Sequence, residues 1–340
     1  MENATIANIF AAMNKNNYLK MKLRSILLKP GSILFCTVSF FFFNVHAQTP
    51  ADAVLMQPGQ FCGAITFNNS SASEYWQGDS LIENGNVGTF TSQTIGAGFV
   101  LGVIKNLNVY ASLPLIMNKP SAGFVEGTSG IQDFTIAAKY QLLDKKIGSG
   151  NLKALVSATG TLPASNYIPE HPYAIGLGCS DGIGRAILAY KTDLGVFAKA
   201  QTGYHVRGNC ELARGYYFTD EEGYSSNIVD MPNAIDYSAT IGYITEDSRT
   251  FKAEAEFSVF NSLGGFDIRP WDQGFPSNEM DAMRIGANFQ YIPEYAKGFG
   301  LLLNTAYTLD GRNVWKTFNI GGGITYFFNI WNKEEAASAE

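Results

Sequence analysis

The sequence lacks any apolar run long enough to form a transmembrane helix. Such a helix needs about 20 consecutive apolar residues, and the run that comes nearest, SILFCTVSFFFFNV at residues 32–45, is shorter. The mean hydropathy of −0.02 also excludes a helical membrane protein. If this chain crosses a membrane, it does so with strands.

Cysteine, histidine and basic residues are also scarce. There are four cysteines and three histidines, and 30 acidic residues outnumber 24 basic ones, for a net charge of −6. This acidic balance argues against a nucleic-acid partner. No group of cysteines and histidines has the spacing of metal ligands, so we expect neither a metal nor another cofactor.

The N-terminal 47 residues have the features of a leader. Lys22, Arg24 and Lys29 precede the apolar run, and Val45-His46-Ala47 offers small residues before a cleavage point at Gln48. Residues 1–20 are long and polar for such a leader, so we expect the true start at Met21; the alternative is a genuine N-terminal extension. Residues 48–59 then read as a short linker.

Residues 60–328 alternate between strand-like segments and connections of two lengths. Five connections are long and polar, and five are short; only the last, near 311–313, breaks the alternation because it is short where a long one is expected. This rhythm is typical of an up-and-down transmembrane β-barrel, with short periplasmic turns and longer extracellular loops. The twelve predicted antiparallel strands are residues 60–67, 89–103, 107–117, 131–143, 152–163, 181–191, 194–207, 234–245, 251–262, 282–293, 299–310 and 315–328.

Alternation within the strands predicts which face meets lipid. In FKAEAEFSVF, residues 251–260, apolar side chains occupy one parity and polar ones the other. A soluble sandwich would bury the apolar face, whereas a membrane barrel turns it outward. Aromatic residues of that parity gather at both strand ends, as at bilayer interfaces, which favours the membrane barrel.

One stretch resembles a known family. GIQDFTIAAKYQLLDKK, residues 130–146, carries Gly130, Asp133, Lys139 and Tyr140 at the spacing G-x-x-D-x-x-x-x-x-K-Y. This pattern, with NLNVYASLPLIM at residues 106–117, resembles a family of outer-membrane transporters associated with the phenol meta-degradation pathway. The resemblance implies an outer-membrane location and passage of small molecules, and it transfers no binding residue. The polar tail at residues 329–340 departs from the usual C-terminal aromatic.

The polar parity predicts the residues that line the lumen. We expect these to be Asp133, Lys139, Arg185, Lys199, His205, Arg207, Asp236, Lys252, Glu254, Glu256 and Arg284. They can select solutes in an open channel, or they can pair with one another and fill a narrow barrel. Both interpretations stay open here.

The remaining alternatives concern chemistry. His205 is the lumen histidine that could serve a nucleophile, but no G-x-S-x-G motif occurs, so an outer-membrane hydrolase is the least favoured function. Cys62, Cys179 and Cys210 remain after leader removal. Because Cys179 and Cys210 lie in or beside two expected extracellular loops, a disulfide and two free thiols are both open.

We therefore expect an all-β outer-membrane barrel of a Gram-negative-type bacterium. Its expected function is a channel or transporter for small solutes, hydrophobic or aromatic ones among them; the alternative is a structural or surface-interaction barrel with a plugged lumen. The expected partners are outer-membrane lipid, the solute and the barrel-assembly machinery.

Overall fold

The structure, a computed structural model, describes residues 49–331 apart from residues 84, 86, 125, 171–173, 220, 221, 246–250, 268–277, 294 and 297. The predicted leader and nearly all of the polar tail lie outside the described residues. Within them, no helix is long and apolar enough to cross a membrane.

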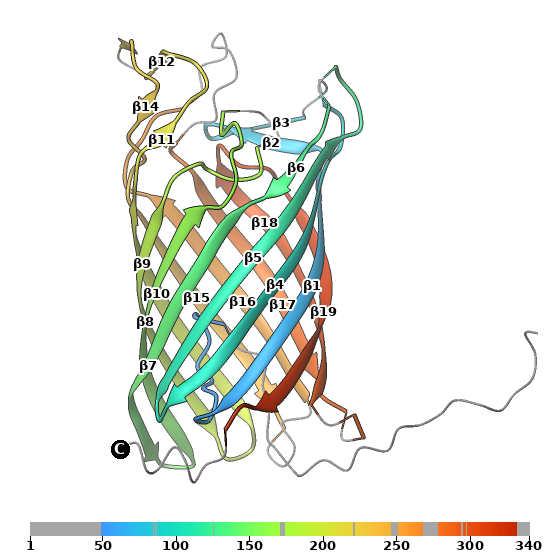
Figure 1. The fold of residues 1–340 in the computed structure, drawn as a ribbon, viewed down its shortest axis with the longest axis vertical. Coiled ribbons are helices and arrows are strands. Elements are labelled where there is room, and N and C mark those ends of the chain that lie inside the picture. The colour runs from blue at the N-terminus through green and yellow to red at the C-terminus, as the bar shows by residue number, and fades with distance from the viewer. Residues whose placement is uncertain are drawn as a thin grey trace, which may run out of the picture. The chain divides into compact units, whose positions relative to one another are not determined.

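The described chain forms one closed antiparallel barrel with twelve crossings (Figure 1). The edges of the sheet meet because β4 pairs with both β1 and β5, and β1 also pairs with β19. The crossing strands are β1 (Gln60–Ala72), β4 (Phe90–Ile104), β5 (Leu107–Pro120), β6 (Thr128–Ile131) continued by β7 (Asp133–Ile147), β8 (Gly150–Pro163), β9 (Asp181–Thr192), β10 (Val196–Arg207), β15 (Ala234–Ile244), β16 (Phe251–Ser262), β17 (Asp281–Tyr291), β18 (Phe299–Arg312) and β19 (Phe318–Asn329). The predicted all-β fold and its twelve strands are confirmed.

The outer surface of the barrel is apolar. In β16, Phe251 and Phe257 are exposed, whereas Glu254 and Glu256 on the other parity are half-buried. Exposed aromatic residues gather toward the short-turn rim and, more sparsely, toward the opposite rim: Tyr140, Tyr243, Phe251, Tyr291, Phe299, Tyr326 and Phe328, then Tyr204, Tyr237 and Tyr307. Such a surface is stable in lipid, with aromatic rings at the two interfaces, and it supports the predicted outer-membrane location.

Tight turns close the short-turn rim of the barrel. Between β4 and β5, Asn106 adopts a positive φ of 69°, the left-handed conformation that closes a tight hairpin turn beside a β-bulge, and the register shifts between Gly102 and Ile104. Between β7 and β8 the connection is shorter than the predicted 144–151, because β7 continues to Ile147 and β8 begins at Gly150. Gly148, with φ of 60°, makes this turn possible. The predicted turn at residues 246–250 lies outside the described residues.

The long loops carry short strands of their own at the other rim, the top of Figure 1. Three hairpins form there: β2 (Glu74–Gln77) with β3 (Ser80–Glu83), β11 (Cys210–Glu211) with β14 (Ile228–Val229), and β12 (Tyr217–Phe218) with β13 (Gly223–Tyr224).

The short connection between β18 and β19 is covered by the first of these hairpins. The backbone N–H of Trp76 donates to the carbonyl of Val314 at 2.9 Å, and that of Lys316 donates to the carbonyl of Glu74 at 3.0 Å. Hence the connection that is shorter than expected is covered by the loop between β1 and β4.

The N-terminal segment, residues 49–59, lies inside the barrel toward the short-turn rim (Figure 1). Its Met56 is buried among inward-facing apolar side chains, including Val100, Tyr110 and Phe327. The carbonyl of Gly59 accepts from the N–H of Ile330 at 2.8 Å, which joins the segment to the end of β19. The sequence predicts only a short linker here. We call residues 49–59 the plug segment.

Candidate functional site

Two lysines of the barrel wall hold the plug segment. Lys139, on β7, is fully buried, and its Nζ lies 2.6 Å from Oδ1 of Asp52. The same ammonium donates to the carbonyls of Thr49 at 2.7 Å and Asp52 at 3.1 Å. Lys199, on β10, donates to the carbonyl of Ala51 at 3.0 Å. All three protons of the Lys139 ammonium are therefore satisfied by the plug segment.

Asp52 organises the turn that these lysines bind. Its Oδ1 accepts from the backbone N–H of Val54 at 2.8 Å, and its Oδ2 accepts from that of Thr49 at 2.5 Å. Burial acts to raise the pKa of the Asp52 carboxyl, but the charges of Lys139 and Lys252 outweigh it and hold the pKa below its ordinary value. Asp52 is thus an anion at neutral pH, and its charge ties the segment to the wall.

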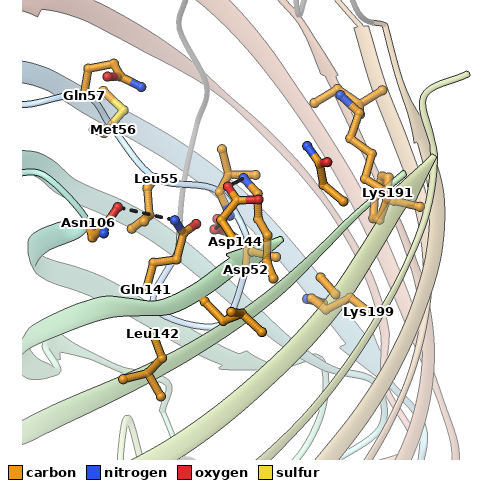
Figure 2. Close-up of a pocket in the computed structure, with 18 of the residues that line it drawn as sticks. Asp52, Leu55, Met56, Gln57, Asn106, Gln141, Leu142, Asp144, Lys191 and Lys199 are labelled. Atoms are coloured by element: carbon orange, nitrogen blue, oxygen red, sulfur yellow. Dashed lines mark hydrogen bonds and ion pairs between the residues drawn. The ribbon is translucent and has the colours of Figure 1, made fainter. Parts of the chain in front are cut away.

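The plug segment lies between two cavities in the lumen. The lower cavity, of about 550 Å³, is lined by residues near the short turns, among them Asn106, Gln141 and Asp144 (Figure 2). The upper cavity, of about 880 Å³, is lined by the middle of the wall, including Asn68, Thr94 and Asn288. Four residues border both cavities: Asp52, Lys199, Lys252 and Glu254. These four mark the place where the two cavities approach each other.

The two cavities differ in charge. Five lysines and three carboxylates line the lower one: Lys105, Lys153, Lys191, Lys199, Lys252, Asp52, Asp144 and Glu254. Two lysines and four carboxylates line the upper one: Lys199, Lys252, Asp52, Asp133, Glu254 and Glu256. The lower cavity therefore has an excess of positive charge, and the upper cavity has an excess of negative charge.

The predicted lumen charges form local pairs along the wall. Lys252 lies 2.8 Å from Glu254 on the same strand, and Lys199 lies 3.6 Å from Glu256, two strands away. Asn288 on β17 donates to Glu254 at 3.3 Å. These pairs run along the wall and leave space in the upper cavity, so they do not fill the lumen.

A second network lies above the plug segment and joins β9, β10 and β15. The two ring nitrogens of His205 lie 2.7 Å from Asp181 and 2.9 Å from Asp236. Asp236 also accepts from Arg185 at 2.6 Å. Ionised carboxylates only accept, so when both aspartates are ionised both nitrogens of the ring donate and the imidazole is positively charged.

This arrangement bears on the hydrolase alternative. A nucleophile–histidine site requires one carboxylate to orient the histidine. Two aspartates lie within hydrogen-bond distance of His205. With both ring nitrogens occupied by carboxylates, however, neither can take a proton from a nucleophile. The network is suited to holding three strands together.

The other predicted lumen residues lie at different heights. Asp133 accepts from the hydroxyl of Tyr167 at 2.8 Å, which ties β7 to the loop at residues 164–180. Arg207 donates through Nη2 to Ser262 at 3.1 Å and through Nε to the carbonyl of Pro232 at 2.5 Å, at the long-loop ends of three strands. Arg284 pairs in register with Ser258 on the inward face and is solvent-exposed. The structure thus brings most of the predicted set into two clusters and leaves these three apart.

Sequence reasoning missed Asp52, the residue that the wall binds most closely. Asp52 precedes the first strand, where neither parity nor periodicity applies. The available signal was Lys139 itself, a cation on the inward parity of its strand, which calls for an anionic partner once it is buried. Nothing local identifies that partner.

No family model and no curated protein matches the chain. Among solved structures, the chain is similar to an outer membrane channel from Pseudomonas putida, with a TM-score of 0.63 and 14% identity over 83% of this chain and 100% of that one. It is also similar to the transport unit of the autotransporter AIDA-I from Escherichia coli, with a TM-score of 0.46 and 10% identity over 82% and 95% of the two chains. The first similarity confirms the outer-membrane barrel fold that the family resemblance implied.

Proposed function

We propose that this outer-membrane barrel is a channel for small solutes and that the plug segment controls passage through it. The observation that carries the proposal is the pair of cavities separated by residues 49–58. A barrel with only a structural role would have no reason to keep polar space on both sides of one thin segment. The solved structure to which this chain is similar with a TM-score of 0.63 is an outer membrane channel, and this likeness supports the proposal.

The lining of the lumen supports small solutes that carry polar groups. Polar side chains such as Asn68, Gln201 and Asn304 border the upper cavity together with the charged pairs. They can replace part of a solute's hydration during passage. The family resemblance extends the proposal to aromatic solutes, and polar substituents would suit them to this lumen.

The proposed role needs no catalytic chemistry, and we propose that the chain is not an enzyme. We also propose that residues 1–47 are removed on export to the outer membrane of a Gram-negative-type bacterium, where the barrel-assembly machinery inserts the barrel into lipid. Cleavage before Gln48 would leave the plug segment at the N-terminus of the mature chain. A segment with one free end can move out of the lumen without dragging further chain through it.

The alternative is a permanently plugged barrel. The satisfied ammonium of Lys139 favours this alternative, because a well-paired buried charge is costly to separate. Two observations favour a movable segment. Lys199 makes a single contact with it, to the carbonyl of Ala51, and there is space on both sides of the segment. Electrical measurement separates the two.

The test is single-channel conductance in planar bilayers, with a matched variant that keeps the leader but lacks residues 49–56. We expect brief openings from the wild-type protein and sustained, larger conductance from the variant. Liposome swelling with benzoate, phenol and neutral sugars then ranks the solutes. A wild-type barrel that never conducts, beside a folded variant that does, would establish the plugged barrel. Two folded proteins without conductance would refute the channel.

A further inference from the structure

Cys179 and Cys210 lie directly beyond the extracellular ends of two paired strands. The ladder of β9 and β10 ends with Asp181 opposite Arg207. The backbone N–H of Gly208 donates to the carbonyl of Ser180 at 2.8 Å, which extends the pairing by one step. Cys179 is the next residue on one side, and Cys210 follows two residues later on the other. In this register Cys210 lies opposite Gly178, the residue before Cys179, so the two cysteines are diagonal neighbours. Facing Cα atoms are about 4.5–5.5 Å apart and consecutive ones about 3.8 Å, which gives a diagonal separation of about 6 Å, within the range that a disulfide spans.

The sulfur of Cys210 points toward the chain of Cys179. A Cβ placed on Gly178 would lie 3.3 Å from the Cys210 Sγ, so this sulfur packs against the residue before Cys179. Both cysteines are buried in one cluster with Leu212, Val229 and Phe266. This cluster brings together the loops at residues 164–180, 208–233 and 263–281. Both thiols are free in the structure.

We propose that Cys179 and Cys210 form a disulfide in the exported protein, which joins the loop at residues 164–180 to the loop at residues 208–233. The inference rests on export and not on conduction. The two thiols lose two protons and two electrons, and one S–S bond forms. The electrons pass to a thiol–disulfide oxidant of the periplasm, whose own disulfide is reduced to a dithiol. Disulfides form and persist in that compartment.

Burial sets the time at which the bond can form. It raises the pKa of the Cys179 thiol to about 11 and that of the Cys210 thiol to about 12. Thiol–disulfide exchange needs the thiolate, so exchange is slow once the loops have packed. The bond therefore forms while the loops are still open, and the packed cluster afterwards shields it from reductants.

Cys62 provides an internal control. It lies on β1, inside the barrel, in the apolar cluster around Met56, and that cluster contains no second cysteine among the described residues. It is as buried as the other two cysteines, so reagent access alone cannot distinguish them. We expect it to remain a thiol.

The experiment uses the full protein isolated from outer membranes. Free thiols are alkylated under denaturing conditions without reductant, and the protein is digested and mapped by mass spectrometry. We expect one peptide pair linked through Cys179 and Cys210, and an alkylated Cys62. In the variant Cys62→Ser the linked pair should persist, whereas in Cys210→Ser the Cys179 peptide should be alkylated. Because the wild-type map decides by itself, a variant that fails to assemble leaves the test intact.

Two outcomes would overturn the proposal. One is alkylation of both Cys179 and Cys210 in the wild-type protein. The other is a bond between two chains, which would double the apparent mass of the protein on a non-reducing gel. A second measurement tests the shielding: a reductant applied to the folded barrel should leave the linked pair intact, and the same reductant should cleave it after unfolding. Equal cleavage before and after unfolding would contradict the buried position of the bond.

Discussion

The ion pair between Lys139 and Asp52 is the contact that seats the plug segment. The two side chains meet at 2.6 Å, and Lys139 has no exposure to solvent. They are separated by 87 positions in the sequence. A buried ammonium without a partner is strongly destabilising, so the segment can leave only if water or a solute anion takes its place at Lys139. Occupancy of this one site therefore couples the position of the segment to the contents of the lumen.

Replacing Asp52 with Asn should loosen the plug segment. The amide keeps the size of the side chain but removes the charge that faces Lys139. Removing one partner of a buried ion pair destabilises the seated state by about 3–5 kcal/mol. Part of this penalty disappears when the segment leaves, because water then reaches Lys139. We expect a higher open probability in single-channel recordings and an unchanged barrel by circular dichroism.

Asp144→Asn is the matched control for this prediction. Asp144 also borders the lower cavity and lies 3.6 Å from Lys153, with its side chain 39% exposed. The substitution removes the same charge from the same cavity, away from Lys139. Equal effects of the two variants would show that lumen charge, and not the seat of the segment, controls opening.

The outward face of β16 should not tolerate a charge. Ala255 is exposed on the parity of Phe251 and Phe257, and an arginine at the middle of the bilayer costs about 2–4 kcal/mol on this face. Ala255→Arg should therefore lower the yield of heat-modifiable, folded barrel. Asn288→Arg is the control because Asn288 borders the upper cavity beside Glu254. If both variants fold equally well, the assigned register is wrong.

The strands and their inward faces could be predicted because both depend on the local alternation of polar and apolar residues. In β16 a period of two separates Lys252 and Glu254 from Phe251 and Ala253, and no distant residue is needed to recognise it. The same parity placed Lys139 and Arg185 inside. Strand ends were less accurate, as at Ile147, because ladders continue beyond the bilayer wherever the turn permits.

The contacts within the lumen could not be predicted, because they depend on register and on distant chain. Asp236 reaches both Arg185 and His205 only because Gly203 lies between them; a Cβ at that glycine would lie 2.2 Å from Oδ2 of Asp236. Parity places these residues on one wall but does not say which are neighbours. The plug segment is a stronger case, since its position depends on a lysine in another part of the chain.

The loop at residues 208–233 should be accessible from outside the cell. Its Gly215 has open space around it, so an epitope inserted there should not disturb the barrel. We expect antibody labelling of intact cells for this insertion. An insertion between Gly148 and Ser149, at the opposite rim, should be labelled only after the outer membrane is permeabilised. The reverse result would invert the orientation of the barrel.

Neutralising Glu254 and Glu256 together should shift ion selectivity toward anions. These residues supply two of the four carboxylates of the upper cavity, and they balance Lys252 and Lys199. Glutamine can still hydrogen-bond to Asn288 and Thr240, which now contact the two carboxylates, so the barrel should keep its fold. Fixed charges in a narrow passage are weakly screened, and the two lysines would then dominate the field. The reversal potential in a salt gradient measures the change.

Glu74→Gln is the control and should leave selectivity unchanged, because Glu74 pairs with Lys316 at the long-loop rim. A lower melting temperature without any conductance would instead show that the pairs serve a closed structural interior, and unchanged selectivity in a conducting barrel would contradict the role assigned to these two glutamates.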